Sequence, residues 1–362
     1  MKNIIKFTQN RVWRTYQGGK LLDDIAGISP SKDSSFPEDW IGSTVAAKNV
    51  GREHIQEGLA VVKNAQGETV PFKEILLKHQ DFYLGQINGQ LRPLDDIPLV
   101  KFLDSATRLH FQAHPTREFA QQRLDSNRGK TEAYVILAIR EEVTKPYIYA
   151  GFQRPPTRAE LKLWIETQNI AAIEGCFDKI PVKPGDVFLL PGGRPHALGE
   201  GILMLEIMEP SDWAVRFEFE RCGYVIPEAA RFMGRDIETA LDVFNFDAVT
   251  QENIDAEFRC VPKVLHKDGQ GNLLEELIGA DNTDCFRVRR ARLTSSFARR
   301  ERDFFYGIVV AGSGSITFDG QLIALKQWET FFLPAEVIDF CYQSTEGLTI
   351  IECYPAERSS HE

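Results

Sequence analysis

Residues 109–137 read LHFQAHPTREFAQQRLDSNRGKTEAYVIL, and residues 181–199 read PVKPGDVFLLPGGRPHALG. Both segments alternate short apolar runs with turn residues, which is typical of β-strands joined by tight loops. Each of their histidines, taken alone, is more often an ordinary buried or surface residue. Together, however, the two segments supply four side chains that can bind one metal ion: Gln112, His114, Glu132 and His196.

The expected strands bring these four side chains together. Gln112 and His114 are two residues apart, so on a strand they project from the same face. Glu132 begins a second strand-like run, and His196 follows a short apolar run and a Pro-Gly-Gly turn. Two imidazoles with oxygen donors suit zinc, and a site that keeps one position open for water or substrate is catalytic. The sequence therefore predicts one Zn²⁺ per chain.

The composition is that of an ordinary globular protein. The chain has 362 residues, 43% of them apolar, which is long enough for two domains. Its formal net charge is −10 and it has no basic stripe, so neither nucleic acid nor a membrane surface is an expected partner. No signal peptide or membrane span is expected. The six scattered cysteines favour reduced thiols in a cytoplasmic protein.

Short strands dominate the expected secondary structure, and helices are inserted between them. Residues 71–77 and 116–124 are expected to form short helices. Residues 156–176 are expected to form one or two amphipathic helices, because Thr157 and Glu160 make a capping box. A further helical segment at 226–246 is expected to bridge the two halves of the chain.

One internal echo indicates a duplicated fold. Residues 182–193, VKPGDVFLLPGG, align with residues 325–336, LKQWETFFLPAE, which places Asp339 opposite His196. Nothing in the second copy resembles the Gln-x-His pair, and the glycine-punctuated segment 312–325 is typical of a hairpin in small double-stranded β-helix barrels. We therefore expect a mainly β protein with two such barrels. A metal-binding catalytic domain would span 1–245, with its helical insertions at about 156–176 and 226–246, and a metal-free barrel would span 246–362.

Several motifs also occur in the order found in one enzyme family. They are PLVKFLDS (98–105), FQAHP (111–115), GKTE (129–132), VKPGDVFLLPGGRPHAL (182–198), GILMLEI (201–207), SDWAVR (211–216) and ETALDV (238–243). In these residues the chain resembles the type I phosphomannose isomerases, the zinc-dependent mannose-6-phosphate isomerase family with a cupin (jelly-roll) fold. The resemblance implies duplicated cupin barrels and an enzyme that interconverts mannose 6-phosphate and fructose 6-phosphate.

The resemblance also assigns roles to residues. The family's metal ligands correspond to the same four positions, and its active-site lysine, acidic residue and arginine correspond to Lys130, Glu206 and Arg216. Aldose–ketose isomerisation moves a proton between C1 and C2 through a cis-enediol. It therefore needs a general base, a Lewis-acidic metal and cations that stabilise developing negative charge. Glu206 is the favoured base, with Lys130 or a ligand histidine as rivals, and Arg216 is the favoured electrostatic contact.

The chain departs from the family pattern around the expected substrate. His110 stands where a serine is usual, HPTR replaces HPDD, and Arg194 stands where a small residue is frequent. WIGS at 40–43 replaces WEIS and lacks its acidic residue. We interpret Trp40, His110 and Arg194 as candidate substrate contacts. These departures leave another phosphosugar, or a free sugar, open as the substrate.

Two other classes of function stay open on the sequence alone. A metal-binding cupin could bind a sugar and regulate or scaffold without turnover, although binding alone does not require Lys130, Glu206 and Arg216. A metal-dependent oxygenase would use an iron site richer in histidine. The expected partner is a sugar or sugar phosphate, and the chain is expected to be a monomer or a homodimer.

Overall fold

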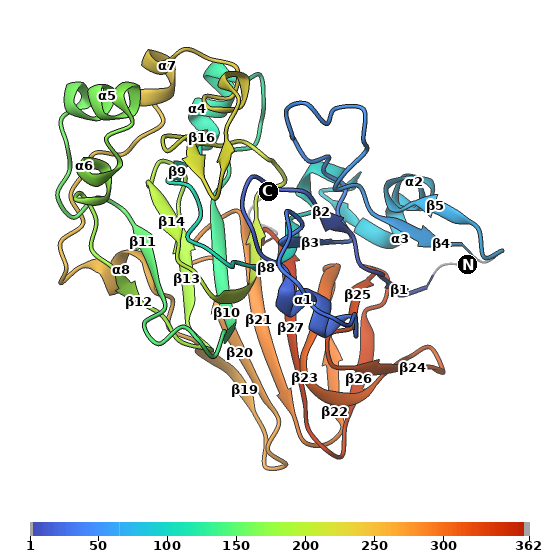
Figure 1. Cartoon of the computed structure of the whole chain (residues 1–362). Coiled ribbons are helices and arrows are strands. Elements are labelled where there is room, and N and C mark those ends of the chain that lie inside the picture. The colour runs from blue at the N-terminus through green and yellow to red at the C-terminus, as the bar shows by residue number, and fades with distance from the viewer. Residues whose placement is uncertain (1–2, 65, 358–362) are drawn as a thin grey trace.

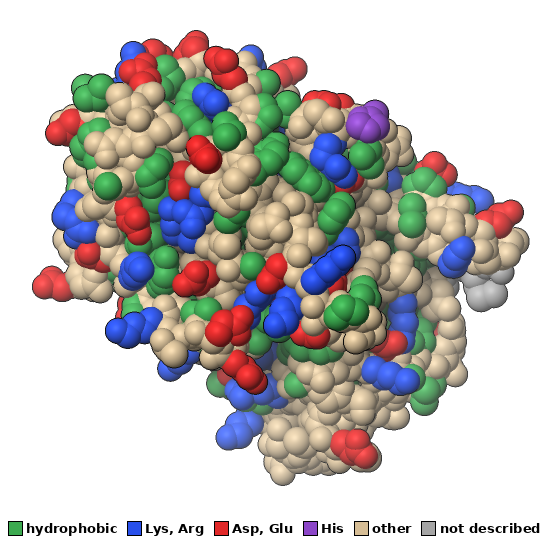
Figure 2. Space-filling view, in the orientation of Figure 1, with side chains coloured by type: hydrophobic (Ala, Val, Ile, Leu, Met, Phe, Trp, Pro, Cys, Tyr) green, Lys and Arg blue, Asp and Glu red, His purple; other side chains and the backbone are tan. Residues whose placement is uncertain are grey.

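The protein consists mainly of β-strands that form two adjoining barrels (Figure 1). The computed structural model describes residues 3–64 and 66–357. The mainly β, cupin-type architecture predicted from the sequence is confirmed. Within these residues, no helix is long and apolar enough to cross a membrane. On the face shown in Figure 2, acidic and basic side chains are interspersed, and no large basic patch forms.

The first barrel is built from two antiparallel sheets whose side chains meet in a common interior. A six-stranded sheet has the order β13-β10-β15-β8-β3-β2, and a five-stranded sheet has the order β12-β11-β14-β9-β16. The strands of the first sheet are β2 (Arg11–Val12), β3 (Glu38–Ile41), β8 (Leu99–Asp104), β10 (Glu132–Ile139), β13 (Val187–Leu190) and β15 (Ile202–Met208). Those of the second are β9 (Gln112–Ala113), β11 (Tyr147–Ala150), β12 (Ile180–Pro181), β14 (His196–Leu198) and β16 (Val215–Arg216).

The second barrel is one ten-stranded antiparallel sheet that contains the C-terminal strands and the first strand of the chain. Its members are β1 (Ile5–Lys6), β19 (Lys263–Lys267), β20 (Leu273–Ile278), β21 (Phe286–Leu293), β22 (Phe297–Arg300), β23 (Phe305–Phe318), β24 (Gln321–Lys326), β25 (Thr330–Leu333), β26 (Asp339–Gln343) and β27 (Leu348–Pro355). Three separate hairpins pair β4 (Val61–Lys63) with β5 (Thr69–Pro71), β6 (Gln86–Ile87) with β7 (Gln90–Leu91), and β17 (Glu220–Arg221) with β18 (Tyr224–Val225).

The two barrels pack sheet against sheet, and this packing explains which side chains face the first barrel's interior. On β15, Leu205 and Ile207 belong to a buried apolar cluster that also contains Ile308 of β23 and Ile351 of β27. Glu206 lies between them in sequence, so it projects from the opposite face, into the interior of the first barrel. Because side chains alternate along β15, those on one face pack in the apolar core and those on the other face point into the site.

The helices are short and lie at the edges of the barrels. The capping box is confirmed: the Thr157 hydroxyl accepts from the Glu160 amide, and the Glu160 carboxylate accepts from the Thr157 amide. The helices are α1 (Lys20–Ile25), α2 (Phe72–Lys78), α3 (Gln80–Leu84), α4 (Arg117–Arg123), α5 (Arg158–Thr167), α6 (Ile170–Glu174), α7 (Ile237–Leu241) and α8 (Ile254–Phe258), with 3₁₀ turns η1 (Leu94–Asp96) and η2 (Glu228–Ala230).

The helical bridge expected at 226–246 is much shorter than predicted. It contains only η2 and α7, because Met233 and Gly234 both have positive φ angles, 57° and 75°, between them. Such a conformation cannot continue a right-handed helix.

The strand boundaries agree with the internal sequence repeat between residues 182–193 and 325–336. β13 and β25 occupy aligned positions, and β14 begins at His196 just as β26 begins at Asp339. The pairing registers correspond as well, since Glu132 pairs with Leu190 in the first barrel and Phe305 with Leu333 in the second. His196 pairs with Gln112, and Asp339 pairs with Arg300. The second barrel thus carries Arg300, Phe305 and Asp339 in place of Gln112, Glu132 and His196.

The division of the chain into domains at residue 245 stays a prediction. Two contacts cross it: β1 pairs with β25 of the second barrel, and Arg259, just after α8, forms a β-bridge with Phe188 of the first. Residues from both sides of the predicted boundary therefore contribute to each barrel.

Candidate active site

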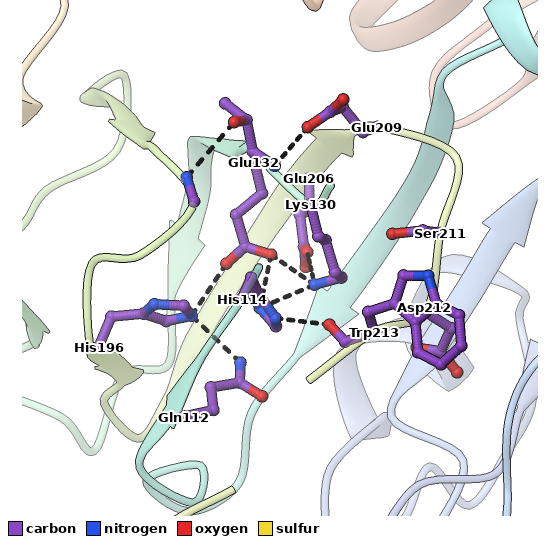
Figure 3. A network of polar contacts seen from close by, with 12 residues as sticks. Gln112, His114, Lys130, Glu132, His196, Glu206, Glu209, Ser211, Asp212 and Trp213 are labelled. Atoms are coloured by element: carbon purple, nitrogen blue, oxygen red, sulfur yellow. Dashed lines mark hydrogen bonds and ion pairs between the residues drawn. The ribbon is translucent and has the colours of Figure 1, made fainter. Parts of the chain in front are cut away.

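Three of the four predicted metal ligands form one buried group (Figure 3). His114 follows β9, Glu132 begins β10 and His196 begins β14, and their donor atoms all lie within 4.8 Å of one another. The Glu132 carboxylate lies between the rings, with Oε2 3.1 Å from His114 Nε2 and Oε1 3.1 Å from His196 Nε2. Gln112 is adjacent, with its amide nitrogen 3.2 Å from His196 Nε2. The strands therefore bring together all four side chains that the sequence pattern selected.

Backbone carbonyls set the tautomers of both histidines. His114 Nδ1 donates to the Trp213 carbonyl at 2.8 Å, and His196 Nδ1 donates to the Arg194 carbonyl at 2.9 Å. Because a carbonyl can only accept, each Nε2 presents a lone pair toward Glu132. Burial, assisted by Lys130, lowers the pKa of His114 to about 3, so this ring is neutral at pH 7.

This donor set fits a divalent metal ion. Two imidazole lone pairs and a carboxylate that converge in one buried place are the nitrogen and oxygen donors that zinc prefers, and carbonyls that hold the distal ring nitrogens are the usual support of metal-bound histidines. Turning the Gln112 amide by 180° puts its oxygen where the nitrogen lies, since the two atoms are interchangeable in shape. His114, Glu132, His196 and Gln112 are thus the residues that would hold zinc.

Glu206 lies beside this group, between two lysines. Its side chain is buried, with Oε2 3.0 Å from Lys101 Nζ and Oε1 3.9 Å from Lys130 Nζ. Lys130 also contacts the metal group, at 2.6 Å from Glu132 Oε2 and 2.9 Å from His114 Nε2. Burial raises the pKa of Glu206 to about 8, against the pull of Lys101 and with a contribution from Glu132. The cavity therefore holds a carboxyl group able to gain and lose a proton near neutral pH.

Sequence reasoning missed several charged residues of this cavity, among them Glu38 and Lys101. Lys101 Nζ lies 3.1 Å from Glu38 Oε1, and the other Glu38 oxygen accepts from Arg14 and from the Trp40 indole. Burial opposes ionisation of Glu38, but Arg14 and Lys101 hold its pKa below the usual range. A signal was present in each case: Lys101 interrupts the apolar run PLVKFL, and Glu38 precedes Trp40 by two residues.

Further cations line the mouth of the cavity. Arg14 is held by Asp212 at 2.9 Å as well as by Glu38. The Lys48 ammonium lies over the Trp213 ring, 3.0 Å from its centroid. Arg216, which the sequence predicted, lines the same cavity and donates to the Ala230 carbonyl at 3.2 Å. Among the described residues, no carboxylate forms an ion pair with Lys48 or Arg216.

The structure places the three predicted substrate contacts differently. His110 lines the cavity, but both its ring nitrogens face backbone carbonyls, of Glu218 at 3.1 Å and Thr15 at 3.3 Å. Burial lowers its pKa to about 4. This ring is therefore a fixed wall of the cavity and no part of the metal group.

Trp40 and Arg194 do not reach the cavity. Trp40 is fully buried behind Glu38, to which its indole donates at 2.7 Å. The Arg194 side chain pairs with Glu257 at 2.5 Å and donates to the Asp247 carbonyl, so its guanidinium is already bound on the outside of the barrel. Only its backbone serves the site, through the carbonyl that holds His196.

Comparisons with known proteins agree with this fold. No protein-family model matches the chain. It is 28% identical over 334 residues to the probable mannose-6-phosphate isomerase GmuF of Bacillus subtilis, a match that covers 92% of this chain and 93% of that protein. It is 29% identical over 283 residues to the mannose-6-phosphate isomerase of Streptococcus mutans, which covers 76% of this chain and 79% of that protein.

Solved structures share the fold along its whole length. The crystal structure of the mannose 6-phosphate isomerase from Bacillus subtilis superposes with a TM-score of 0.73 at 23% identity, covering 97% of this chain and 99% of the other. A zinc-bound mannose 6-phosphate isomerase superposes with a TM-score of 0.69 at 16% identity, covering 98% of this chain and 100% of the other. In its sequence relatives and its duplicated cupin fold, the chain is similar to the type I mannose-6-phosphate isomerases.

Proposed function

We propose that this protein is a zinc-dependent aldose–ketose isomerase that interconverts mannose 6-phosphate and fructose 6-phosphate. The observation that carries the proposal is the position of Glu206. This buried carboxyl lies in one cavity with a His-Glu-His group and is flanked by Lys101 and Lys130. The sequence relatives, which carry the name mannose-6-phosphate isomerase, support the same reaction.

A bound zinc ion would supply Lewis acidity that polarises the sugar carbonyl and its neighbouring hydroxyl. Gln112, His114, Glu132 and His196 would hold it. The remaining chemistry belongs to the chain's own side chains.

Glu206 is the residue suited to move the proton. As a carboxylate it would take the proton from C2 of the aldose, so that the C1–C2 bond would become the double bond of the enediol and the carbonyl electron pair would pass to O1. The same proton would return to C1 of the ketose, while the proton of the C2 hydroxyl would pass to O1. A pKa of about 8 lets one group serve as base and then as acid near neutral pH. Of the rival bases that the sequence left open, Lys130 is engaged as a cation by Glu132, and the His114 ring has both nitrogens occupied.

The cations around Glu206 have a second task. Lys101 and Lys130 would stabilise the negative charge that develops on the enediolate oxygens. At the mouth, Lys48 and Arg216 are available to a phosphate group, because neither forms an ion pair with a described carboxylate. A local cluster of this kind is what an anionic substrate requires on a chain whose net charge is −10.

The test is a coupled isomerase assay on zinc-loaded protein, with mannose 6-phosphate and free mannose as parallel substrates. We expect turnover of the phosphosugar that a chelator abolishes and added zinc restores. Turnover of free mannose alone would overturn the assignment of the substrate. Stoichiometric zinc without turnover of either sugar would favour a sugar-binding protein, which has no need of a proton-transferring carboxyl.

A further inference from the structure

Glu209, a buried residue outside the metal group, forms hydrogen bonds with the backbone of the short segment that carries two of the site's side chains. Thr131 lies between Lys130 and Glu132, and its amide donates to Glu209 Oε2 at 3.0 Å. The Glu209 amide in turn donates to the Thr131 carbonyl at 3.1 Å. Both backbone groups of Thr131 are therefore fixed by one residue, located directly after β15.

A single arginine holds the other oxygen of that glutamate. Arg117 Nε donates to Glu209 Oε1 at 2.7 Å, and Glu209 itself is only 2% exposed. The remaining guanidinium nitrogens reach the second barrel, where Nη1 contacts Asp284 at 2.8 Å and Nη2 contacts Cys285 Sγ at 3.0 Å. Arg117 thus joins the start of α4, the end of β15 and the loop that follows β20.

These contacts have a direct consequence for the site. Lys130 and Glu132 lie on either side of Thr131, and both side chains point into the metal group. A shift of the Thr131 backbone would move both of them. A buried carboxylate without its cation is costly, so loss of Arg117 would favour a rearrangement of Glu209 and, with it, of this segment.

We propose that Arg117 and Glu209 are positioning residues, which hold the Lys130–Thr131–Glu132 backbone so that the metal group keeps its geometry. The proposal rests on zinc binding as part of the proposed function. It does not depend on which sugar is the substrate, because the two residues act on the protein's own backbone. It also gives the second barrel a part in the site, through Asp284 and Cys285.

The experiment compares zinc affinity, measured by competition with a chromophoric chelator, in four variants and the parent protein. Arg117→Ala and Glu209→Ala remove the two partners. Arg117→Lys keeps a cation that can still pair with Glu209. The matched control is Arg259→Ala, because the Arg259 side chain is also 26% exposed and pairs with Asp186 and Asp255, away from the metal group.

We expect Arg117→Ala and Glu209→Ala to weaken zinc binding on the order of 10-fold, the low end of the effect of outer partners on metal sites. Arg117→Lys should recover most of this loss, and Arg259→Ala should bind zinc like the parent. In the isomerase assay kcat should fall while KM stays unchanged, because no substrate contact is removed.

Two results would overturn the proposal: parental zinc affinity in both Arg117→Ala and Glu209→Ala, or an equal loss in Arg259→Ala. Failure of the proposed function gives a different pattern. In that case the parent protein itself binds no zinc, or binds zinc and turns over neither sugar, whatever the affinities of the variants.

Discussion

The metal group depends on two backbone carbonyls as well as on its four side chains. The Trp213 and Arg194 carbonyls hold His114 and His196 in the tautomer that presents Nε2 to Glu132. Each histidine therefore contributes an oriented lone pair to the metal group.

We expect His114→Ala and His196→Ala to lower zinc affinity by more than the 10- to 100-fold that loss of an outer partner typically costs, because each removes a donor. Zinc content after dialysis, measured by atomic absorption, checks this. His110→Ala is the matched control, a buried histidine of the same cavity whose ring faces only carbonyls. Stoichiometric zinc in both ligand variants would exclude this site.

The four donors could be predicted from the sequence because local pattern fixes them. Gln112 and His114 need only a strand, and Glu132 and His196 each stand at the edge of one. Lys101 and Glu38 could not be placed in this way. Lys101 meets Glu206 and Trp40 through the registers of three strands that are far apart in sequence, and a single sequence does not reveal those pairings.

Asp39 gives a pH-dependent prediction at the same scale. It lies on β3 next to Glu38, and burial raises its pKa to about 6, against the Asn10 amide and Arg11. A carboxyl whose pKa is raised on folding contributes stability below its unfolded pKa of about 4 and loses it as the pH rises through about 6.

Asparagine keeps the shape of Asp39 but cannot ionise. We therefore expect the unfolding free energy of Asp39→Asn to exceed that of the parent protein by up to about 3 kcal/mol at pH 8, with the difference shrinking toward pH 4. Urea unfolding at the two pH values measures it. The same difference in unfolding free energy at pH 4 and pH 8 would contradict a raised pKa of Asp39.

At the scale of elements, tight loop crossings bring β10, β13 and β9 together. A Cβ on Gly192, in the turn after β13, would lie 2.7 Å from the Pro115 carbonyl oxygen, next to His114. The following amide, of Gly193, donates to the His114 carbonyl at 2.7 Å. Only a residue without a side chain lets these two loops approach so closely.

Gly192→Ala should therefore displace the His114 loop, weaken zinc binding and destabilise the fold by about 1–3 kcal/mol, the usual range for overpacking. Gly269→Ala is the control, because a Cβ there meets nothing within 4 Å. Zinc affinity and urea unfolding of the two variants are the measurements. Equal zinc affinity and equal stability of the two variants would show that the close contact between the Gly192 turn and the His114 loop has no role.

Element boundaries followed the sequence where a local signal was strong. The run VFLL predicts β13, the echo predicts β25, and the capping box predicts the start of α5. The segment 226–246 misled because its apolar residues suggest a helix while two positive φ angles break it. The tertiary environment of this segment determines the positive φ angles, and the apolar pattern of the sequence does not indicate them.

At the scale of the whole molecule, the two barrels use their interiors differently. A buried ion pair in the second barrel occupies the place that corresponds to the active-site cavity of the first. Glu352 is fully buried and accepts from Arg299 at 3.0 Å, and the hydroxyls of Tyr342 and Tyr354 also donate to it. By register, Glu352 of β27 pairs with Gly307 of β23. Glu206 pairs with Tyr134 at the corresponding place of the first barrel.

Glu352→Ala should cost about 3–5 kcal/mol of unfolding free energy, because it leaves the Arg299 cation buried without its partner. The adjacent pair Arg300–Asp339 lies at the surface, with both side chains more than half exposed. Asp339→Ala should therefore cost about 0–1 kcal/mol. Chemical denaturation of the two variants checks the difference, and equal losses would exclude a buried polar core as the second barrel's main support.

The most direct test of the central claim is the turnover of zinc-loaded Glu206→Gln with mannose 6-phosphate. Glutamine has the shape of the buried carboxyl but cannot take a proton, and Glu206 is not among the residues that would hold the metal. We expect full zinc content and a kcat at least about 100-fold lower, the smallest loss typical of a missing general base. Full zinc content with a kcat close to that of the parent protein would contradict the account and remove Glu206 from the reaction.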